Sequence, residues 1–153
     1  MKKRKLAALL LAVSMGLAGC GSKPAADIDI DSLAAKLTSD VAFEDELSLI
    51  DDGMISMVYN DALQWEDAVL YMGSGATAEE VAVFACADET AAKTALTEAE
   101  AHIESQKESY ESYVPEEVKR LDEAIVRQSG KYVVVVVTED TAAAEAVLKE
   151  YLG

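Results

Sequence analysis

The chain has 153 residues, 29 of them acidic and 13 basic, so its formal net charge at neutral pH is −16. A surface this acidic repels nucleic acid and anionic lipid headgroups, which argues against nucleic-acid binding and phosphate recognition. The length suits one domain with a single hydrophobic core.

The first twenty residues have the pattern of an export signal. Four consecutive basic residues, 2–5, precede an apolar run over 6–18, which is too short for a membrane-spanning helix of about 20 residues. The tetrapeptide that follows, Leu17-Ala18-Gly19-Cys20, resembles the lipobox of bacterial lipoproteins. This resemblance implies that a diacylglyceryl group is attached to Cys20 and that the leader is cleaved after Gly19. Two acyl chains hold a protein stably on a membrane.

These features divide the chain into three parts. We expect a lipoprotein signal peptide over 1–19, a lipidated cysteine and short tether over 20–27, and a single α+β domain over 28–153. Loss of the four basic leader residues leaves a mature net charge near −20. The domain is expected on the extracytoplasmic face of the cell membrane, held by the lipid on Cys20 and repelled from the headgroups by its own charge.

The mature domain opens with Asp27-Ile28-Asp29-Ile30-Asp31, which begins like a calcium-binding loop. The sixth position of such a loop requires glycine and is Ser32 here, and the twelfth requires a bidentate glutamate and is Thr38. We therefore expect a helix over 33–37, capped by Asp31 or Ser32, instead of a calcium site.

A second short helix is predicted over 52–59, with Asp51 as its N-cap. Met54, Met57 and Val58 are spaced to form its buried stripe, because methionines at helical spacing usually fill gaps in a core. We interpret them as core residues and not as ligands.

Two later segments share one order of elements: strand, strand and helix. The first has strands at 69–71 and 81–87 and a long helix over 88–114, which Pro115 ends before a short helix over 116–121. The second has strands at 124–127 and 132–138, joined by a tight turn, and a helix over 141–152. Aligned at an offset of 51 residues, the two segments suggest a duplicated β-β-α unit.

The expected fold class is α+β. We predict a small antiparallel sheet of about four strands from two β-β-α units, packed by the long helix and the C-terminal helix, with short N-terminal helices. The valine run 133–137 is apolar on both faces and should form a central strand that is covered on both sides. Two helices can cover one face, so the N-terminal helices or a partner must cover the other. This is the one structural hint of an interface.

Three stretches, "GSGATAEEVAVF", "SQKESYESYVPEEV" and "GKYVVVVV", resemble a bacterial lipoprotein family catalogued as domain of unknown function 4358. The resemblance extends over about 30–152, which is nearly the whole mature chain. It implies a small secreted α+β domain, and it transfers no catalytic residue to this chain.

The sequence offers few residues for catalysis. Gly73-Ser74-Gly75 lacks the lysine of a phosphate-binding loop and is interpreted as a turn between strands.

His102 lies one helical turn after Glu98, and we expect an exposed histidine paired with this glutamate, because a zinc site needs three or four ligands. Cys86 lies in an apolar strand and is interpreted as a small core residue. A Cys86–His102 dyad stays open, with nothing beyond the presence of both residues to support it.

Four aromatic residues are candidates for contact with a ligand or partner: Trp65, Tyr71, Tyr110 and Tyr113. For Trp65, packing on the edge of the core is favoured over ligand contact. We expect no enzymatic activity, no cofactor and no metal. The expected function is a binding or accessory module that docks another envelope protein. The alternatives are a receptor for a small solute or a divalent cation and, third, a hydrolase.

Overall fold

The computed structural model describes residues 27–153. The predicted signal peptide, Cys20 and most of the tether lie outside the described residues, so lipidation stays a prediction. Among the described helices, none combines the length and the apolar character needed to cross a membrane.

A five-stranded sheet lies at the centre of the fold, in the order β1-β2-β3-β5-β4, and all neighbouring strands are antiparallel. This confirms the α+β class and the antiparallel sheet. The strands are β1 (Ser48–Leu49), β2 (Asp67–Met72), β3 (Glu80–Ala85), β4 (Ile125–Ser129) and β5 (Tyr132–Val137). The hairpins β2–β3 and β4–β5 are the two that the sequence predicts, whereas β1 is an additional short strand at one edge.

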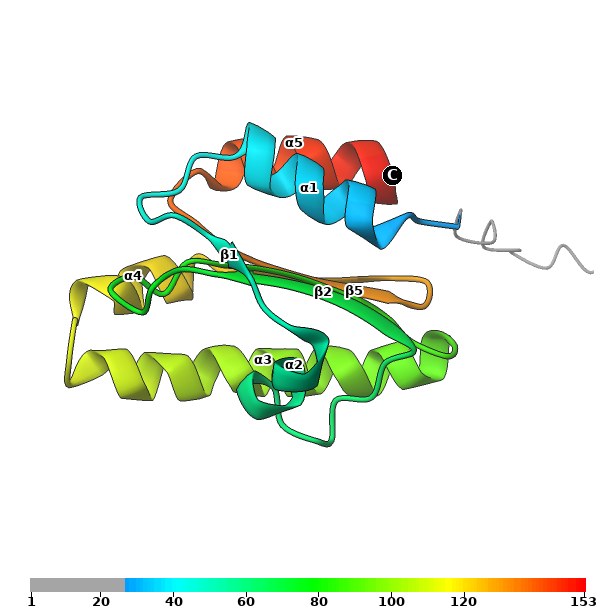
Figure 1. The fold of residues 1–153 in the computed structure, drawn as a ribbon, viewed down its shortest axis with the longest axis horizontal. Helices are drawn as coiled ribbons and strands as arrows, with labels where there is room; N and C mark the ends of the chain where they lie inside the picture. Colours follow the sequence, from blue (N-terminus) through cyan, green and yellow to red (C-terminus); the bar gives the residue numbers. More distant parts are fainter. Residues whose placement is uncertain (1–26) are drawn as a thin grey trace, which may run out of the picture.

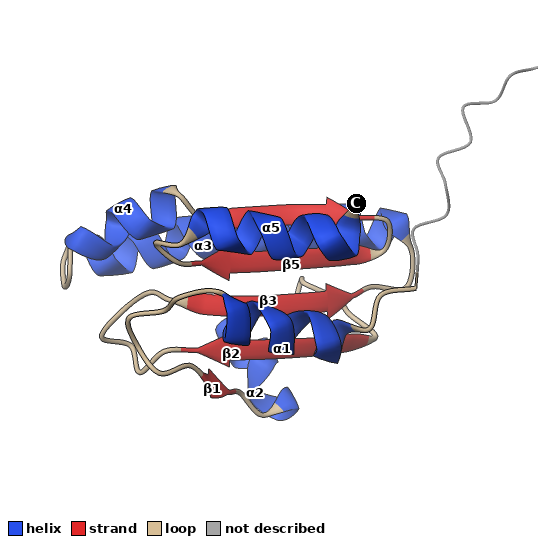
Figure 2. Ribbon diagram, turned by 90° about the horizontal axis from the view of Figure 1, so that it is seen from above, coloured by secondary structure: helices blue, strands red, loops and turns tan. Residues whose placement is uncertain are grey.

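Helices cover both faces of the sheet (Figures 1 and 2). One face carries α1 (Ile30–Asp40) and α5 (Thr141–Leu152), and the other carries α2 (Asp52–Val58), α3 (Glu89–Glu111) and α4 (Glu116–Asp122). The long helix α3 and the C-terminal helix α5 therefore lie on opposite faces, and not together on one face as the sequence suggests. Two separate hydrophobic cores result, one on each side of the sheet, instead of the single core expected from the sequence.

The valine run forms the central strand β5, as predicted, and every residue of this strand is buried. Alternate residues contribute to the two cores: 133, 135 and 137 on the α3 side, and 132, 134 and 136 on the side of α1 and α5. Full burial of each valine side chain stabilises the fold by about 1.5–3 kcal/mol. Because the chain's own helices cover both faces, this strand needs no partner to cover it.

A one-residue difference between two connections accompanies the placement of α3 and α5 on opposite faces. Strands β3 and β5 keep equivalent positions in the same core at the 51-residue offset, whereas the helix N-caps Asp88 and Asp140 are 52 residues apart. Side chains alternate between the two faces of a strand, so one extra residue changes the face from which the chain departs. The two β-β-α units consequently differ in arrangement.

The helix α1 starts earlier than predicted and is capped by a different residue. Its N-cap is Asp29, whose carboxylate accepts the backbone N–H of Ser32 at 3.1 Å. Asp31, one of the two predicted caps, instead lies in the first helical turn. A carboxylate at either place interacts favourably with the positive end of the helix dipole.

The predicted buried stripe of α2 is wrong for Met54 and Met57, whereas Val58 packs partly buried against the α3-side core and Asp51 is the N-cap as expected. Met54 is 52% exposed and Met57 is 79% exposed. Ile55 and Tyr59, four residues apart on one helical face, enter the core in their place. A shift of one residue turns the helix face by about 100°. In a helix of only seven residues, the apolar pattern is too short to exclude such a shift.

Candidate functional site

Two of the four aromatic candidates are packed against the cores. The Trp65 ring lies 5.6 Å from the Phe84 ring, and the residue is half-buried at the edge of the α3-side core. It also lines an open hollow of about 370 Å³ together with Ser56 and Asp61. Tyr71 is half-buried against the opposite core, on the side of α1 and α5. These two side chains therefore belong to different faces of the sheet.

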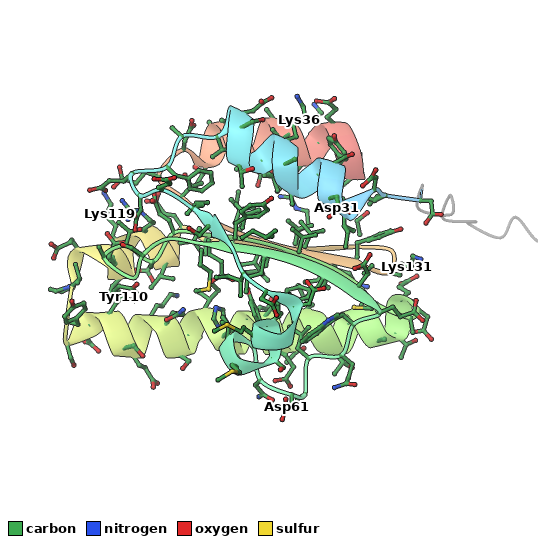
Figure 3. All side chains as sticks on the ribbon, viewed as in Figure 1. Asp31, Lys36, Asp61, Tyr110, Lys119 and Lys131 are labelled. Atoms are coloured by element: carbon green, nitrogen blue, oxygen red, sulfur yellow. The ribbon has the colours of Figure 1, made fainter. Side chains whose placement is uncertain are left out.

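The other two candidates lie at the end of α3. Tyr110 donates its hydroxyl to the carbonyl oxygen of Thr77 at 2.7 Å, so it ties α3 to the connection between β2 and β3 (Figure 3). Burial raises the pKa of the Tyr110 hydroxyl, and the carboxylate of Glu117 adds to this. Tyr113 is 76% exposed. The four predicted contact residues thus form no common site.

A different group of large apolar side chains is exposed at one edge of the sheet. Leu49, Met54 and Met57 have exposed fractions of 63%, 52% and 79%. All three lie within residues 48–58, which we call the β1–α2 edge. Leu49 is paired with Tyr71 and faces the side of α1 and α5, whereas both methionines lie on α2, on the α3 side. In Figure 2 this segment lies beside β2, at the outer edge of the sheet. The sequence interpretation missed this surface because it placed both methionines in the core.

The β1–α2 edge lies in a strongly acidic part of the chain. Residues 37–92 contain 13 acidic residues and no lysine or arginine. Asp51 and Asp52 are exposed at the start of α2, and Asp61 is exposed in the loop that follows it (Figure 3). This run without basic residues is the sequence signal that could have indicated the surface.

Behind α2, three ionisable side chains from three elements form a buried cluster. Tyr59, which ends α2, donates its hydroxyl to Oε1 of Glu80 on β3. His102 Nε2, from α3, lies 3.0 Å from Oε2 of the same carboxylate. The Tyr59 and His102 rings stack with centroids 4.1 Å apart. The side chains of Glu80 and His102 are only 1% and 8% exposed.

This cluster corrects the predicted environment of His102. The histidine is buried and paired with Glu80, whereas Glu98 accepts a hydrogen bond from Asn60 Nδ2 at 3.2 Å. A buried carboxylate requires hydrogen-bond partners, and here both oxygens have one. Burial raises the pKa of Tyr59 well above its usual value, and the adjacent Glu80 carboxylate adds to the effect. The cluster fixes the end of α2 to the sheet and to α3.

Cys86 is a buried core residue, as predicted, and does not meet His102. It follows the far end of β3, six residues and about 20 Å along the strand from the Glu80 that binds His102. Burial raises the pKa of its thiol, and the carboxylates of Asp88 and Glu66 add to this. A raised pKa disfavours the reactive thiolate.

A second buried network surrounds Arg120 of α4, whose side chain is 3% exposed. Its Nη2 donates to Glu44 Oε2 at 2.8 Å and lies 3.4 Å from Glu139 Oε1, and its Nη1 donates to Glu117. Hydrogen bonds and carboxylates raise the pKa of Arg120 against the opposing effect of burial. The two distant segments that carry Glu44 and Glu139 are thereby joined to α4, next to an open hollow of about 600 Å³.

Glu79, the last residue of the connection between β2 and β3, completes this network. Its carboxylate accepts the backbone N–H groups of Glu44 and Asp45 at 2.8–3.0 Å. The Arg120 Nε has no hydrogen-bond partner among residues 27–153, and Glu79 Oε1 lies 3.9 Å away. Because Arg120 is surrounded by carboxylates, the arrangement is a structural clamp and offers no free cation to an anionic substrate.

The glycine-rich stretch is a turn between β2 and β3, as predicted. Asp45 Oδ2 accepts both the backbone N–H and the hydroxyl of Ser74 at 2.6 Å. A Cβ on Gly73 would lie 2.9 Å from the same oxygen, so a larger residue here would displace the Asp45 side chain from this position. Over the part of the chain that the structure describes, no three His, Cys, Asp or Glu side chains are arranged to hold a metal ion.

The fold and its surface define a sheet domain with helices on both faces and an apolar, acidic edge. A family model described as domain of unknown function 4358 matches residues 39–138. The chain belongs to this family. The match includes all five strands and α2 to α4, and it leaves α5 and most of α1 outside. No curated protein and no solved structure matches the chain.

Proposed function

We propose that this protein is a lipid-anchored extracytoplasmic module that docks another envelope protein and has no catalytic activity of its own. One observation carries the proposal: Met54 and Met57 stay exposed together on α2, although helices of the same chain cover both faces of the sheet. Large apolar side chains gathered at a protein surface are typical of interaction sites.

The location rests on the leader and the predicted lipid at Cys20. The described chain begins at Asp27, and α1 starts at the same end of the molecule at which α5 finishes (Figure 1). This end would face the membrane, because the tether is short. The end that carries α4 and the β2–β3 connection would then point away from it.

The buried ionisable groups support a structural role for these residues. Both oxygens of the Glu80 carboxylate are engaged by Tyr59 and His102, and Arg120 is engaged by glutamates. Groups held in this way stabilise the fold and are not directed at a substrate. We therefore place the function at the surface.

Co-purification from membranes tests the proposal. The full chain, extracted from its own bacterial envelope in mild detergent, should retain one envelope protein in a fixed ratio. A thermal-shift screen of the same sample with amino acids, sugars and divalent cations should give no saturable shift. The proposal fails if no envelope protein is retained and one small compound stabilises the protein, by about 2.7 kcal/mol at a hundred times its dissociation constant.

A further inference from the structure

We infer that the β1–α2 edge is the docking surface, and that it takes a basic amphipathic segment of the partner protein. This inference rests on the proposed function, since it assigns the surface and the partner chemistry by which the protein would dock. It names one place on the molecule and one class of occupant.

The apolar part of the surface comes from α2. Met54 and Met57 are three residues apart and share one exposed side of α2, while Ile55 holds the other side in the core. Methionine is unbranched and polarizable, and it adapts to apolar partners of different shape. Leu49 of β1 is exposed as well, but it is paired with Tyr71 and therefore faces the side of α1 and α5, so it is not part of this surface.

Hollows lie on both sides of α2. One, of about 370 Å³, is lined by Ser56, Asp61 and Trp65. The other, of about 180 Å³, is lined by Asn60, His102 and neighbouring residues of α3. An apolar residue of a partner can enter a hollow next to an exposed methionine, as anchor residues do in helix-in-groove recognition.

The charge of this surface selects the occupant. The charged side chains at the edge and its hollows are carboxylates, from Asp51, Asp52, Asp61 and Glu98, and residues 37–92 include no lysine or arginine. Complementary charge attracts lysine and arginine and repels acidic surfaces. A second copy of this chain and an anionic membrane are both repelled, so a basic protein segment is the occupant that fits.

The surface is held in place before any partner binds. Tyr59 fixes the end of α2 through its hydroxyl bond to Glu80 and its stacking on His102. At the other end of α2, Asp51 accepts the backbone N–H of Gly53 at 3.0 Å. A surface that is already ordered loses less conformational entropy on binding.

Two synthetic peptides of about 18 residues test the inference, since this length gives five helical turns. Both carry leucine on one helical face, with lysine on the other face in the first peptide and glutamate in the second. Their binding to the full chain in detergent is measured by fluorescence anisotropy. The lysine peptide should bind saturably and the glutamate peptide should not.

Variants then locate the binding site. Met54→Ser with Met57→Ser should weaken the lysine peptide by about tenfold or more, because two apolar side chains no longer become buried. Tyr113→Ser removes an exposed apolar side chain elsewhere and should change the affinity by less than about twofold. Equal binding of both peptides, no binding of either, or an unchanged affinity in the methionine variant overturns the inference.

The same methionine variant separates this inference from the proposed function. If the variant still retains the envelope partner in membranes while peptide binding is insensitive to it, the surface is assigned wrongly and docking stands. If the wild-type chain retains no partner, the proposed function itself fails.

Discussion

At the level of single residues, the buried carboxylate of Glu80 connects three elements. Glu80 is the first residue of β3. Its carboxylate accepts a hydrogen bond from the hydroxyl of Tyr59 at the end of α2, and its Oε2 lies 3.0 Å from Nε2 of His102 on α3. An unpaired buried carboxylate is costly, so each partner contributes more than an exposed hydrogen bond would.

Tyr59→Phe should lower the free energy of unfolding by about 1–3 kcal/mol, because Glu80 Oε1 loses its donor in a buried place. Tyr113→Phe is the matched control, since this tyrosine is exposed, and should change it by less than about 0.5 kcal/mol. Urea unfolding followed by circular dichroism measures both. Equal stability of the two variants would show that the Tyr59 hydroxyl contributes nothing.

The raised pKa of Tyr59 predicts a dependence of stability on alkaline pH. The unfolded tyrosine loses its proton near pH 10, whereas the folded one keeps it, so stability is fully present below about pH 10 and falls as the pH rises further. Tyr59→Phe should make this decline shallower. Some decline should remain, because the pKa of Tyr110 is raised as well. Unfolding midpoints between about pH 8 and pH 11 measure the slope, and an identical slope in the variant contradicts the prediction.

At the level of elements, Arg120 joins α4 to the loop before β1 and to the loop between β5 and α5. Its partners Glu44 and Glu139 come from these two loops, and Glu79, the residue before β3, lies close to Arg120. The clamp therefore stabilises the end of the molecule that carries α4.

Arg120→Gln should destabilise the protein by about 3 kcal/mol, because the buried Glu79 and Glu117 lose their positive neighbour. Arg127→Gln is the control: its partner Glu145 and Arg127 itself are both substantially exposed, and such pairs contribute about 0–1 kcal/mol. Chemical denaturation compares the two. A loss in Arg120→Gln no larger than that in Arg127→Gln would contradict the clamp.

The elements also show how far the sequence can predict this fold. The two hairpins, α3 and α5 can be predicted from the sequence, because strand alternation and long helical periodicity are local signals. The strand β1 has two residues and α2 has seven, which is too short for periodicity to fix their existence or their face.

The contacts of the candidate site, unlike strands and helices, join residues that are far apart along the chain. Glu80 and His102 are 22 residues apart, and Glu44 and Arg120 are 76 apart. Such pairs depend on how the elements pack, so spacing along the chain does not reveal them. The exposed methionines are wrongly placed for another reason, the shortness of α2, whereas the charge pattern around them can be recognised in the sequence.

At the level of the whole molecule, the fold buries its central strand with its own helices and leaves one apolar edge exposed. The acidic charge opposes contact with nucleic acid, with anionic lipid and with other copies of the chain. A lipid anchor would hold such a protein at the membrane without requiring its surface to touch the headgroups.

Cys20→Ala should abolish incorporation of labelled palmitate into the full chain, because the thiol is the predicted point of lipid attachment. Cys86→Ala is the matched control and should keep the label, since Cys86 is buried in the core. Labelling in growing cells followed by immunoprecipitation gives the result. A label that persists in Cys20→Ala would contradict the predicted anchor.

Crosslinking in intact membranes tests the central claim most directly. A photoreactive amino acid is placed in the full chain at Met57, on the β1–α2 edge, or at Lys149, which is exposed on α5 in the other helical layer. Docking through the edge predicts one discrete adduct from Met57, joined to a lysine- and arginine-rich segment of an envelope protein, and none from Lys149. Absence of an adduct at both positions, or the same adducts from both, would contradict the account.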